Sequence, residues 1–247
     1  MLAVEQVSFS FPGRTILERT SFRLCPGTIT CLVGGNGSGK TTILNLITGF
    51  LRPRAGRIRF GEIELTRLAP FRISRLGIAR TFQDLRLIGK LSVRQNVLLA
   101  LPHHPGERLV QALLPPRYHQ QRDAEDHRKV DALLAEFYLK EVADQAASEI
   151  SYGQQKLLTI ACCAAMDAGL LLLDEPVAGI SPEYRDRIGE RLASIRAAGK
   201  TILLIEHQPD FLELVGERFL FLEAGRLHCF DSFSELSAAP VADEALN

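Results

Sequence analysis

The chain has 247 residues, and a domain of this length buries a sizeable core without disulfides. Hydrophobic residues make up 46% of it and the formal net charge is zero, so the composition indicates neither a disordered chain nor a nucleic-acid partner. The charge is uneven, because residues 51–90 hold ten Lys and Arg against three Asp and Glu, whereas residues 206–247 hold two against nine. Two solvated faces of opposite sign explain this, and the alternative is a basic face near anionic lipid or an acidic partner.

We expect neither a secretory leader nor a membrane span in this sequence. The first residues lack a charged segment followed by an apolar one. No apolar run approaches the roughly 20 residues that cross a bilayer. Any role at a membrane would therefore act through partner proteins.

The first part of the chain predicts strands, one helix and a hairpin. Alternating or continuous apolar positions favour strands within residues 1–11 and 19–34, separated by turns at Pro12-Gly13 and Pro26-Gly27. Residues 41–50 have the pattern of an amphipathic helix. Residues 55–65 predict a hairpin that turns at Phe60-Gly61.

Residues 34–41, between the strand predicted within 19–34 and the helix predicted over 41–50, read GGNGSGKT. This is a complete G-x-x-x-x-G-K-[ST] phosphate-loop motif. Its glycines let the backbone curl and point N–H groups inward, and the helix that follows adds the positive end of its dipole. Lys40 can reach the β- and γ-phosphates, and the Thr41 hydroxyl can ligate Mg²⁺. We assign to nucleotide binding Gly34, Gly35, Asn36, Gly37, Ser38, Gly39, Lys40, Thr41 and Thr42.

The character of the sequence changes over about residues 84–150. Residues 91–101 have helical periodicity, and a long polar helix is predicted over about 117–139. One face of that helix carries Val130, Leu133, Leu134 and Phe137. We interpret 84–150 as a helical subdomain inserted into a nucleotide-binding core of residues 1–83 and 151–247.

Strands and helices alternate after residue 150, which predicts a parallel sheet with right-handed crossovers. Helices are expected over 154–166 and 183–199, and strands over 170–175 and 201–207. Residues 218–230 predict a final hairpin turning at Ala224-Gly225.

Acidic and polar side chains follow these strands. Asp174 ends the strand LLLLD and can help to hold Mg²⁺, and Glu175 can orient or deprotonate the water that attacks the γ-phosphate. Gln83 and His207 also follow apolar strands, but taken alone each is better explained as a strand-end residue or a helix cap. For Ser151, which opens a helix, an ordinary N-cap is the alternative to phosphate binding.

Taken in order, these motifs resemble those of the ATP-binding cassette (ABC) ATPases over essentially the whole chain. GGNGSGKT resembles Walker A, TFQ the Q-loop, ISYGQQ the signature motif, LLLLDEP Walker B and IEH the switch-histidine segment. The resemblance implies a single α/β domain of the P-loop NTPase class, with a mixed-sheet core, an antiparallel β subdomain and an inserted α-helical subdomain.

The resemblance also implies residue roles. Phe11, rather than its neighbour Phe9, would stack on adenine, and Gln83 would sense the γ-phosphate and metal. Ser151 and Gly153, with Gln154 beside them, would bind the γ-phosphate of the opposite subunit's nucleotide, so that two ATP molecules lie between two head-to-tail subunits. Lys40 would hold phosphate, Glu175 would polarise the water and His207 would organise the transition state. The metal ligands would be Thr41, Gln83 and Asp174.

Two departures from the common pattern are Tyr152 within the signature segment and Ser181 where many members carry aspartate. Tyr152 and the Ala-Gly before position 180 resemble the ATPases of branched-chain amino acid importers.

The resemblance also implies partners. These are permease subunits, a second ABC ATPase subunit (a heterodimer is favoured over a homodimer) and, indirectly, a substrate-binding protein. The chain would lie at the cytoplasmic face of the membrane.

Other functions stay open on the sequence alone. An importer of urea or short amides is a close alternative. A soluble ABC protein of DNA maintenance is disfavoured because no sustained heptads occur, and DNA-stimulated hydrolysis would identify it. A non-hydrolysing scaffold is disfavoured by the intact Lys40, Asp174, Glu175 and His207.

Overall fold

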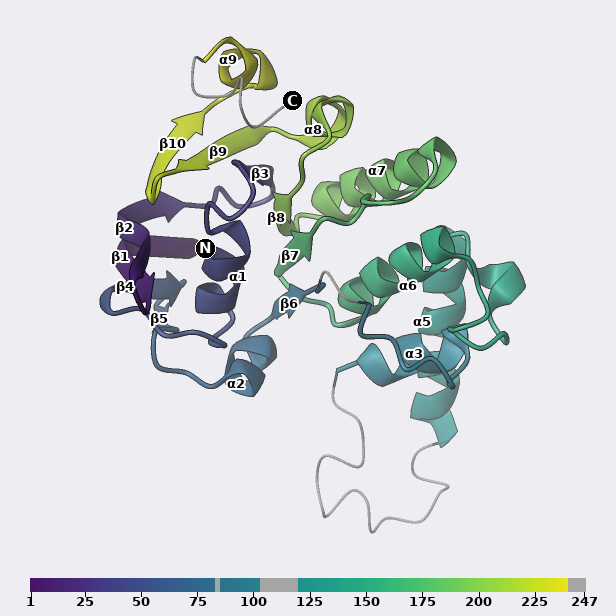
Figure 1. Cartoon of the computed structure of the whole chain (residues 1–247). Coiled ribbons are helices and arrows are strands. Elements are labelled where there is room, and N and C mark those ends of the chain that lie inside the picture. The colour runs from purple at the N-terminus through teal and green to yellow at the C-terminus, as the bar shows by residue number, and fades with distance from the viewer. Residues whose placement is uncertain (83–84, 103–119, 240–247) are drawn as a thin grey trace.

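The computed structural model describes residues 1–82, 85–102 and 120–239 (Figure 1). Two sheets organise these residues. The first has four antiparallel strands in the order β2-β1-β4-β5, namely β1 Leu2–Phe11, β2 Arg14–Arg23, β4 Ala55–Phe60 and β5 Ile63–Glu64. It forms the expected antiparallel part of the fold.

The second sheet has six strands in the order β10-β9-β3-β8-β7-β6. Neighbours from β9 to β6 pair in parallel, and β10 pairs antiparallel with β9, so the predicted mixed sheet is confirmed. Its strands are β3 Ile29–Val33, β6 Ile78–Arg80, β7 Leu170–Asp174, β8 Thr201–Ile205, β9 Arg218–Glu223 and β10 Arg226–Phe230.

Helices cover both faces of the six-stranded sheet. Helix α1 (Lys40–Ile47) lies between the two sheets, whereas α6 (Tyr152–Ala165) and α7 (Pro182–Ala197) pack on the opposite face (Figure 1). Helices α3 and α5 pack against α6. The remaining bounds are α2 Pro70–Arg75, α3 Val93–Ala100, α5 Gln120–Glu136, η3 Lys140–Val142, α8 Pro209–Val215 and α9 Phe233–Ala238.

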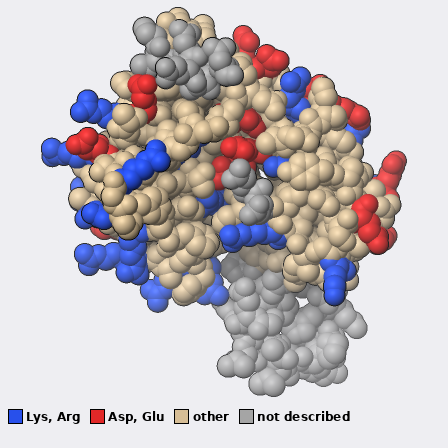
Figure 2. All heavy atoms as spheres, in the orientation of Figure 1, with Lys and Arg blue, Asp and Glu red and all other residues tan. Residues whose placement is uncertain are grey.

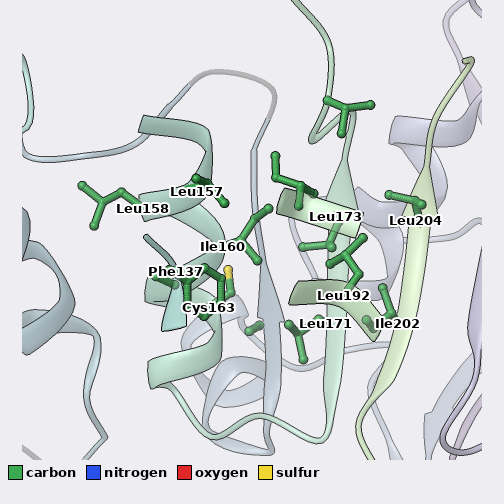
Figure 3. Packing of buried hydrophobic residues seen from close by; sticks show 14 of the residues in the cluster. Phe137, Leu157, Leu158, Ile160, Cys163, Leu171, Leu173, Leu192, Ile202 and Leu204 are labelled. Atoms are coloured by element: carbon green, nitrogen blue, oxygen red, sulfur yellow. The ribbon is translucent and has the colours of Figure 1, made fainter. Parts of the chain in front are cut away.

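The central strands are buried on both faces, and their side chains alternate between two apolar clusters. Leu172 and Leu203 belong to the cluster that contains α1, while Leu171, Leu173 and Leu204 belong to the cluster that contains α6 and α7. Figure 3 shows the second of these clusters, in which Leu171, Leu173 and Leu204 of the sheet lie beside Ile160 and Cys163 of α6 and Leu192 of α7. Because β3, β8 and β7 pair in parallel, their carboxyl ends, and the residues that follow them, lie along one edge of the sheet.

Most expected elements are confirmed, with shifts at their ends. Helix α1 ends at Ile47 rather than residue 50, because Gly49 turns the chain at φ 76°. Helix α5 ends at Glu136 rather than about residue 139, because Tyr138 takes φ 57°, outside the helical region. Residues 117–119 of the predicted helix lie outside the described residues. The hairpin predicted over residues 55–65 turns one residue later than expected, at Gly61 and Glu62. Helices α2, α8 and α9 were not predicted.

The uneven charge of the sequence is visible on the surface. Figure 2 shows Lys and Arg side chains toward the lower left, the side of β4, β5 and α2. Arg52, Arg54, Arg67 and Arg72 are exposed there, whereas the side chain of Arg80, in the same stretch, is only 5% exposed. Within the described residues, no helix combines the length and the apolar character that a membrane crossing requires.

Candidate nucleotide-binding and catalytic site

The phosphate loop joins the carboxyl end of β3 to α1. Gly34 at φ 150° and Gly39 at φ 112° adopt backbone conformations that side chains rarely allow. A Cβ on Gly34 would lie 2.4 Å from the Leu222 carbonyl oxygen, and one on Gly39 would lie 2.6 Å from Ile16. Gly35, by contrast, has open space beside it. Two of the loop glycines are therefore required by the packing itself.

Lys40 is the first residue of α1 and is 6% exposed. Its ammonium donates to the carbonyl oxygens of Gly34 at 2.6 Å and Gly35 at 2.9 Å, so the side chain folds back over the loop. Burial lowers the pKa of Lys40, and the carboxylates of Glu175 and Asp174 oppose that shift. The cation is thus held over the curled loop, within electrostatic reach of Asp174 and Glu175 at the carboxyl end of β7.

The remaining loop residues differ in their exposure. Asn36 is exposed, and the Ser38 hydroxyl is buried and has no hydrogen-bond partner among the described residues. Thr41 is exposed and Thr42 is half-buried, in the first turn of α1. A buried hydroxyl without a partner fits a site that accepts a further polar group.

Asp174 ends β7 and is 2% exposed. Its Oδ2 lies 3.5 Å from the Arg80 guanidinium and has no hydrogen bond among the described residues. Burial raises the pKa of Asp174, while Arg80 acts in the opposite direction. Thr41 and Asp174 line the same cavity, of about 260 Å³. A buried carboxylate oxygen and a hydroxyl that line one cavity are the kind of oxygen ligands that Mg²⁺ prefers.

No group of three His, Cys, Asp or Glu side chains gathers anywhere in the described part of the chain. Mg²⁺ is typically held by one or two protein oxygens together with phosphates and waters, so the pair Thr41 and Asp174 is sufficient protein ligation. The third predicted ligand, Gln83, lies outside the described residues.

Arg80 is a member of this site that the sequence analysis missed. Its guanidinium donates to Asn45 at 2.7 Å and to the Thr48 hydroxyl at 3.1 Å, both on or next to α1. It thereby ties Asp174 to the helix that follows the phosphate loop. The basic character of residues 51–90 gave no signal that this arginine is buried.

Glu175 and His207 follow the neighbouring strands β7 and β8. Glu175 Oε1 lies 3.4 Å from His207 Nε2, and the two side chains are 25% and 29% exposed. Glu175 adopts φ 50°, and its N–H donates to the Ile205 carbonyl at 2.9 Å. A partly exposed carboxylate beside an imidazole can accept a proton from water, which is the chemistry expected of a general base.

Glu206, also missed, fixes the backbone around His207. It is 2% exposed, and its carboxylate accepts hydrogen bonds from the N–H groups of His207 at 2.7 Å and Val177 at 3.2 Å. Burial raises the pKa of Glu206, and these N–H donors act against the shift. The carboxylate thus joins the end of β8 to the loop after Glu175. The sequence signal that could have identified Glu206 as a site residue is its position directly after an apolar strand.

The environment of His207 predicts how acid affects stability. Burial, and then the charge of Lys40, lower the pKa of His207, whereas Glu175 raises it. The unfolded chain therefore binds this proton more readily, and the free energy of unfolding should fall as the pH drops below about 6.5. His207→Gln is expected to lose less stability than the native chain between pH 7 and pH 5 in urea unfolding. The exposed His228→Gln is the control, and equal acid sensitivity of the His207 variant would contradict this explanation.

Phe11 ends β1 with its ring 45% exposed, whereas Phe9 is 8% exposed and belongs to the apolar core. The two rings meet edge to face, 5.0 Å between centroids. Of the two, Phe11 therefore has the surface that a stacking base needs.

Ser151, Gly153 and Gln154 begin α6, on the other face of the sheet from α1. The Ser151 hydroxyl accepts from the Gln154 N–H at 3.3 Å, and the Gln154 side chain accepts from the Ser151 N–H at 2.9 Å. The N-cap alternative is thus realised in a full capping box. The first N–H groups of the helix still point out of its end, where an anion can bind.

The signature segment packs against α7. A Cβ on Gly153 would lie 2.5 Å from the Tyr184 ring, and the Ser151 and Tyr184 hydroxyls are 3.3 Å apart. Tyr152, one of the two departures from the common pattern, is 46% exposed and lies near Gly179. Ser181, the other, is the N-cap residue of α7 without a side-chain cap bond.

Gly153→Ala tests this packing. Alanine normally stabilises a helix by about 1 kcal/mol relative to glycine, but here the methyl group meets the Tyr184 ring, and overpacking costs about 1–3 kcal/mol. We expect urea unfolding to show a net loss of stability. Gly169→Ala, where a Cβ meets nothing within 4 Å, is the control. A stability gain in Gly153→Ala would show that the ring moves aside freely.

Comparisons with known proteins add to this geometry. A family model described as ABC transporter matches residues 17–178. The chain is 34% identical over 212 residues to a probable branched-chain amino acid transport ATP-binding protein LivG of Archaeoglobus fulgidus, covering 86% of this chain and 81% of that protein. It is 34% identical over 226 residues to the high-affinity branched-chain amino acid transport ATP-binding protein LivG of Salmonella typhimurium, covering 91% and 89%.

Solved structures resemble the chain over nearly its whole length. A nucleotide-free ATP-binding cassette from an ABC transporter superposes with a TM-score of 0.84 at 27% identity, covering 99% of this chain and 97% of that one. The ADP conformation of an ATP-binding cassette gives a TM-score of 0.81 at 27% identity, covering 98% and 95%.

Proposed function

The chain belongs to the ABC transporter family, and from that premise we propose that it is the ATPase subunit of an importer for branched-chain amino acids. It binds nucleotide and hydrolyses ATP in coupling to transport. The observation that carries the proposal is the convergence of three strand ends: the phosphate loop follows β3, Asp174 and Glu175 end or follow β7, and His207 follows β8. Ligands of open α/β sheets bind at this carboxyl edge.

We infer the following roles within one subunit. The phosphate loop and Lys40 hold the β- and γ-phosphates, and Phe11 stacks on adenine. Thr41 and Asp174, together with Gln83, hold Mg²⁺, which when bound neutralises phosphate charge. Glu175 accepts a proton from the attacking water, and His207, 3.4 Å from it, organises the γ-phosphate.

The signature residues act on the other subunit's nucleotide in this proposal. Ser151, Gly153 and Gln154 open a helix on the face of the sheet opposite to α1, so they suit a phosphate presented by a second subunit. Two head-to-tail subunits then enclose two ATP molecules. ATP closes the pair, and hydrolysis with product release reopens it. We favour a related ATPase, rather than a second copy, as the partner.

The proposed substrate class rests on the relatives. Those from Archaeoglobus, Salmonella and, at 30% identity, Pseudomonas aeruginosa are named as branched-chain amino acid transport proteins. Tyr152 and the Gln-Gln pair that follows Gly153 support the same subgroup. The chain would work at the cytoplasmic face of the membrane, bound to permease subunits that receive substrate from a separate binding protein.

Uptake of labelled leucine and of labelled urea tests the substrate class. The native chain is compared with Glu175→Gln in cells that lack redundant transporters. Loss of leucine uptake alone in the variant is the expected result. Loss of urea uptake alone would assign the chain to urea or amide import, and survival of both would overturn the import proposal.

A further inference from the structure

Lys156 is a buried lysine that the roles above do not use. It lies in the second turn of α6 and is 4% exposed. Lysine is almost never fully buried unless its ammonium has partners. Here the ammonium donates to the main-chain carbonyl oxygen of Glu175 at 2.9 Å, and the Tyr152 ring lies 5.6 Å away. A buried charge is thus directed at the backbone of the residue proposed as the base.

The backbone of Glu175 needs such support. Its φ of 50° lies in the left-handed region, which is costly for a residue with a side chain and persists when surrounding contacts enforce it. Its N–H donates to Ile205 of β8, and its carbonyl accepts from Lys156 of α6. The peptide groups on both sides of Glu175 are thereby fixed, and with them the direction of a carboxylate 3.4 Å from His207.

The same helix begins with the signature segment, and its first turn is packed on the chain that follows Glu175. The Tyr184 ring fills the space beside Gly153, the Tyr184 hydroxyl meets Ser151, and the Tyr152 ring lies against Gly179. A displacement of the amino end of α6 would therefore also move Lys156, one turn further along the helix, and with it the Glu175 carbonyl.

We propose that Lys156 is a positioning residue for hydrolysis: it holds Glu175 in its productive direction and links it to the helix end that binds the other subunit's nucleotide. This inference rests on the proposed role of Glu175. A carboxylate displaced by about 1 Å from its water can cost roughly 100-fold in rate, while nucleotide affinity depends on the phosphate loop and is unaffected.

The test is Lys156→Met in the transporter complex that contains the chain. We expect kcat for ATP hydrolysis to fall by roughly 10- to 100-fold with KM and ATP affinity unchanged, and Lys156→Arg to restore most of the rate. If the methionine variant does not fold, Lys156→Gln, which is too short to reach the carbonyl, replaces it with the same expectation. Lys200→Met, which removes a lysine paired with Asp167 on the surface, is the control.

A second comparison separates positioning from general damage. In a Glu175→Gln background, Lys156→Met should cause no further loss of hydrolysis, because the group it positions is already inactive. Native kcat in a folded Lys156→Met or Lys156→Gln variant would overturn the inference, as would an equal loss in the Glu175→Gln background. If Glu175→Gln itself keeps native turnover, the proposed role of Glu175 fails instead.

Discussion

Glu175→Gln is expected to lower ATP hydrolysis by about 100- to 10,000-fold, the range of general-base catalysis, and to leave ATP affinity unchanged. Glutamine has nearly the shape of glutamate and keeps the contact with His207, but its amide cannot accept a proton. In the proposed cycle ATP closes the pair of subunits and hydrolysis reopens it, so the variant should also accumulate as a closed ATP-bound pair. Phosphate release and light scattering of the assembled pair measure the two effects.

The matched control is Glu183→Gln, which neutralises an exposed glutamate of α7 that pairs with Arg187. It should keep native hydrolysis, since surface pairs of this kind contribute little. Near-native turnover by Glu175→Gln would remove Glu175 as the main base.

Lys40→Ala is expected to weaken ATP binding by roughly 10- to 100-fold, since a hydrogen bond to a charged group is worth about 1.5–3 kcal/mol. The variant loses the ammonium that lies over the loop and leaves the carbonyls of Gly34 and Gly35 without their donor. Titration calorimetry with ATP gives the affinity directly.

Lys200→Ala serves as the control for this experiment, because its ammonium pairs with Asp167 at the surface. ATP affinity should be unchanged in that variant. If Lys40→Ala also binds ATP with native affinity, the assignment of residues 34–41 as the phosphate loop is wrong.

The elements that could be predicted from sequence are those with a strong local pattern. The five-residue strands β3, β7 and β8 are largely apolar, as expected of strands covered on both faces, and each leads directly into a segment of the site. Helix α8 was missed because its seven residues carry less than two full turns of periodicity. Strand β6, three residues long, gave only a weak apolar signal.

The site residues that could be predicted are likewise those that occur in local sequence motifs. Lys40, Asp174, Glu175 and His207 occur in ordered motifs, and the fold aligns them along one edge. The contacts of Arg80 with Asp174, Glu206 with Val177 and Lys156 with Glu175 join residues that are 19 to 94 positions apart. Such contacts depend on how elements pack, and no local spacing encodes them.

One measurement tests most directly whether hydrolysis at this site drives import. The chain is assembled with its permease and ATPase partners in vesicles, and accumulation of labelled leucine and release of phosphate are followed in the same sample. The account predicts that the native assembly does both and that Glu175→Gln does neither, although it still binds ATP. Leucine accumulation at the native rate in the Glu175→Gln assembly would contradict it.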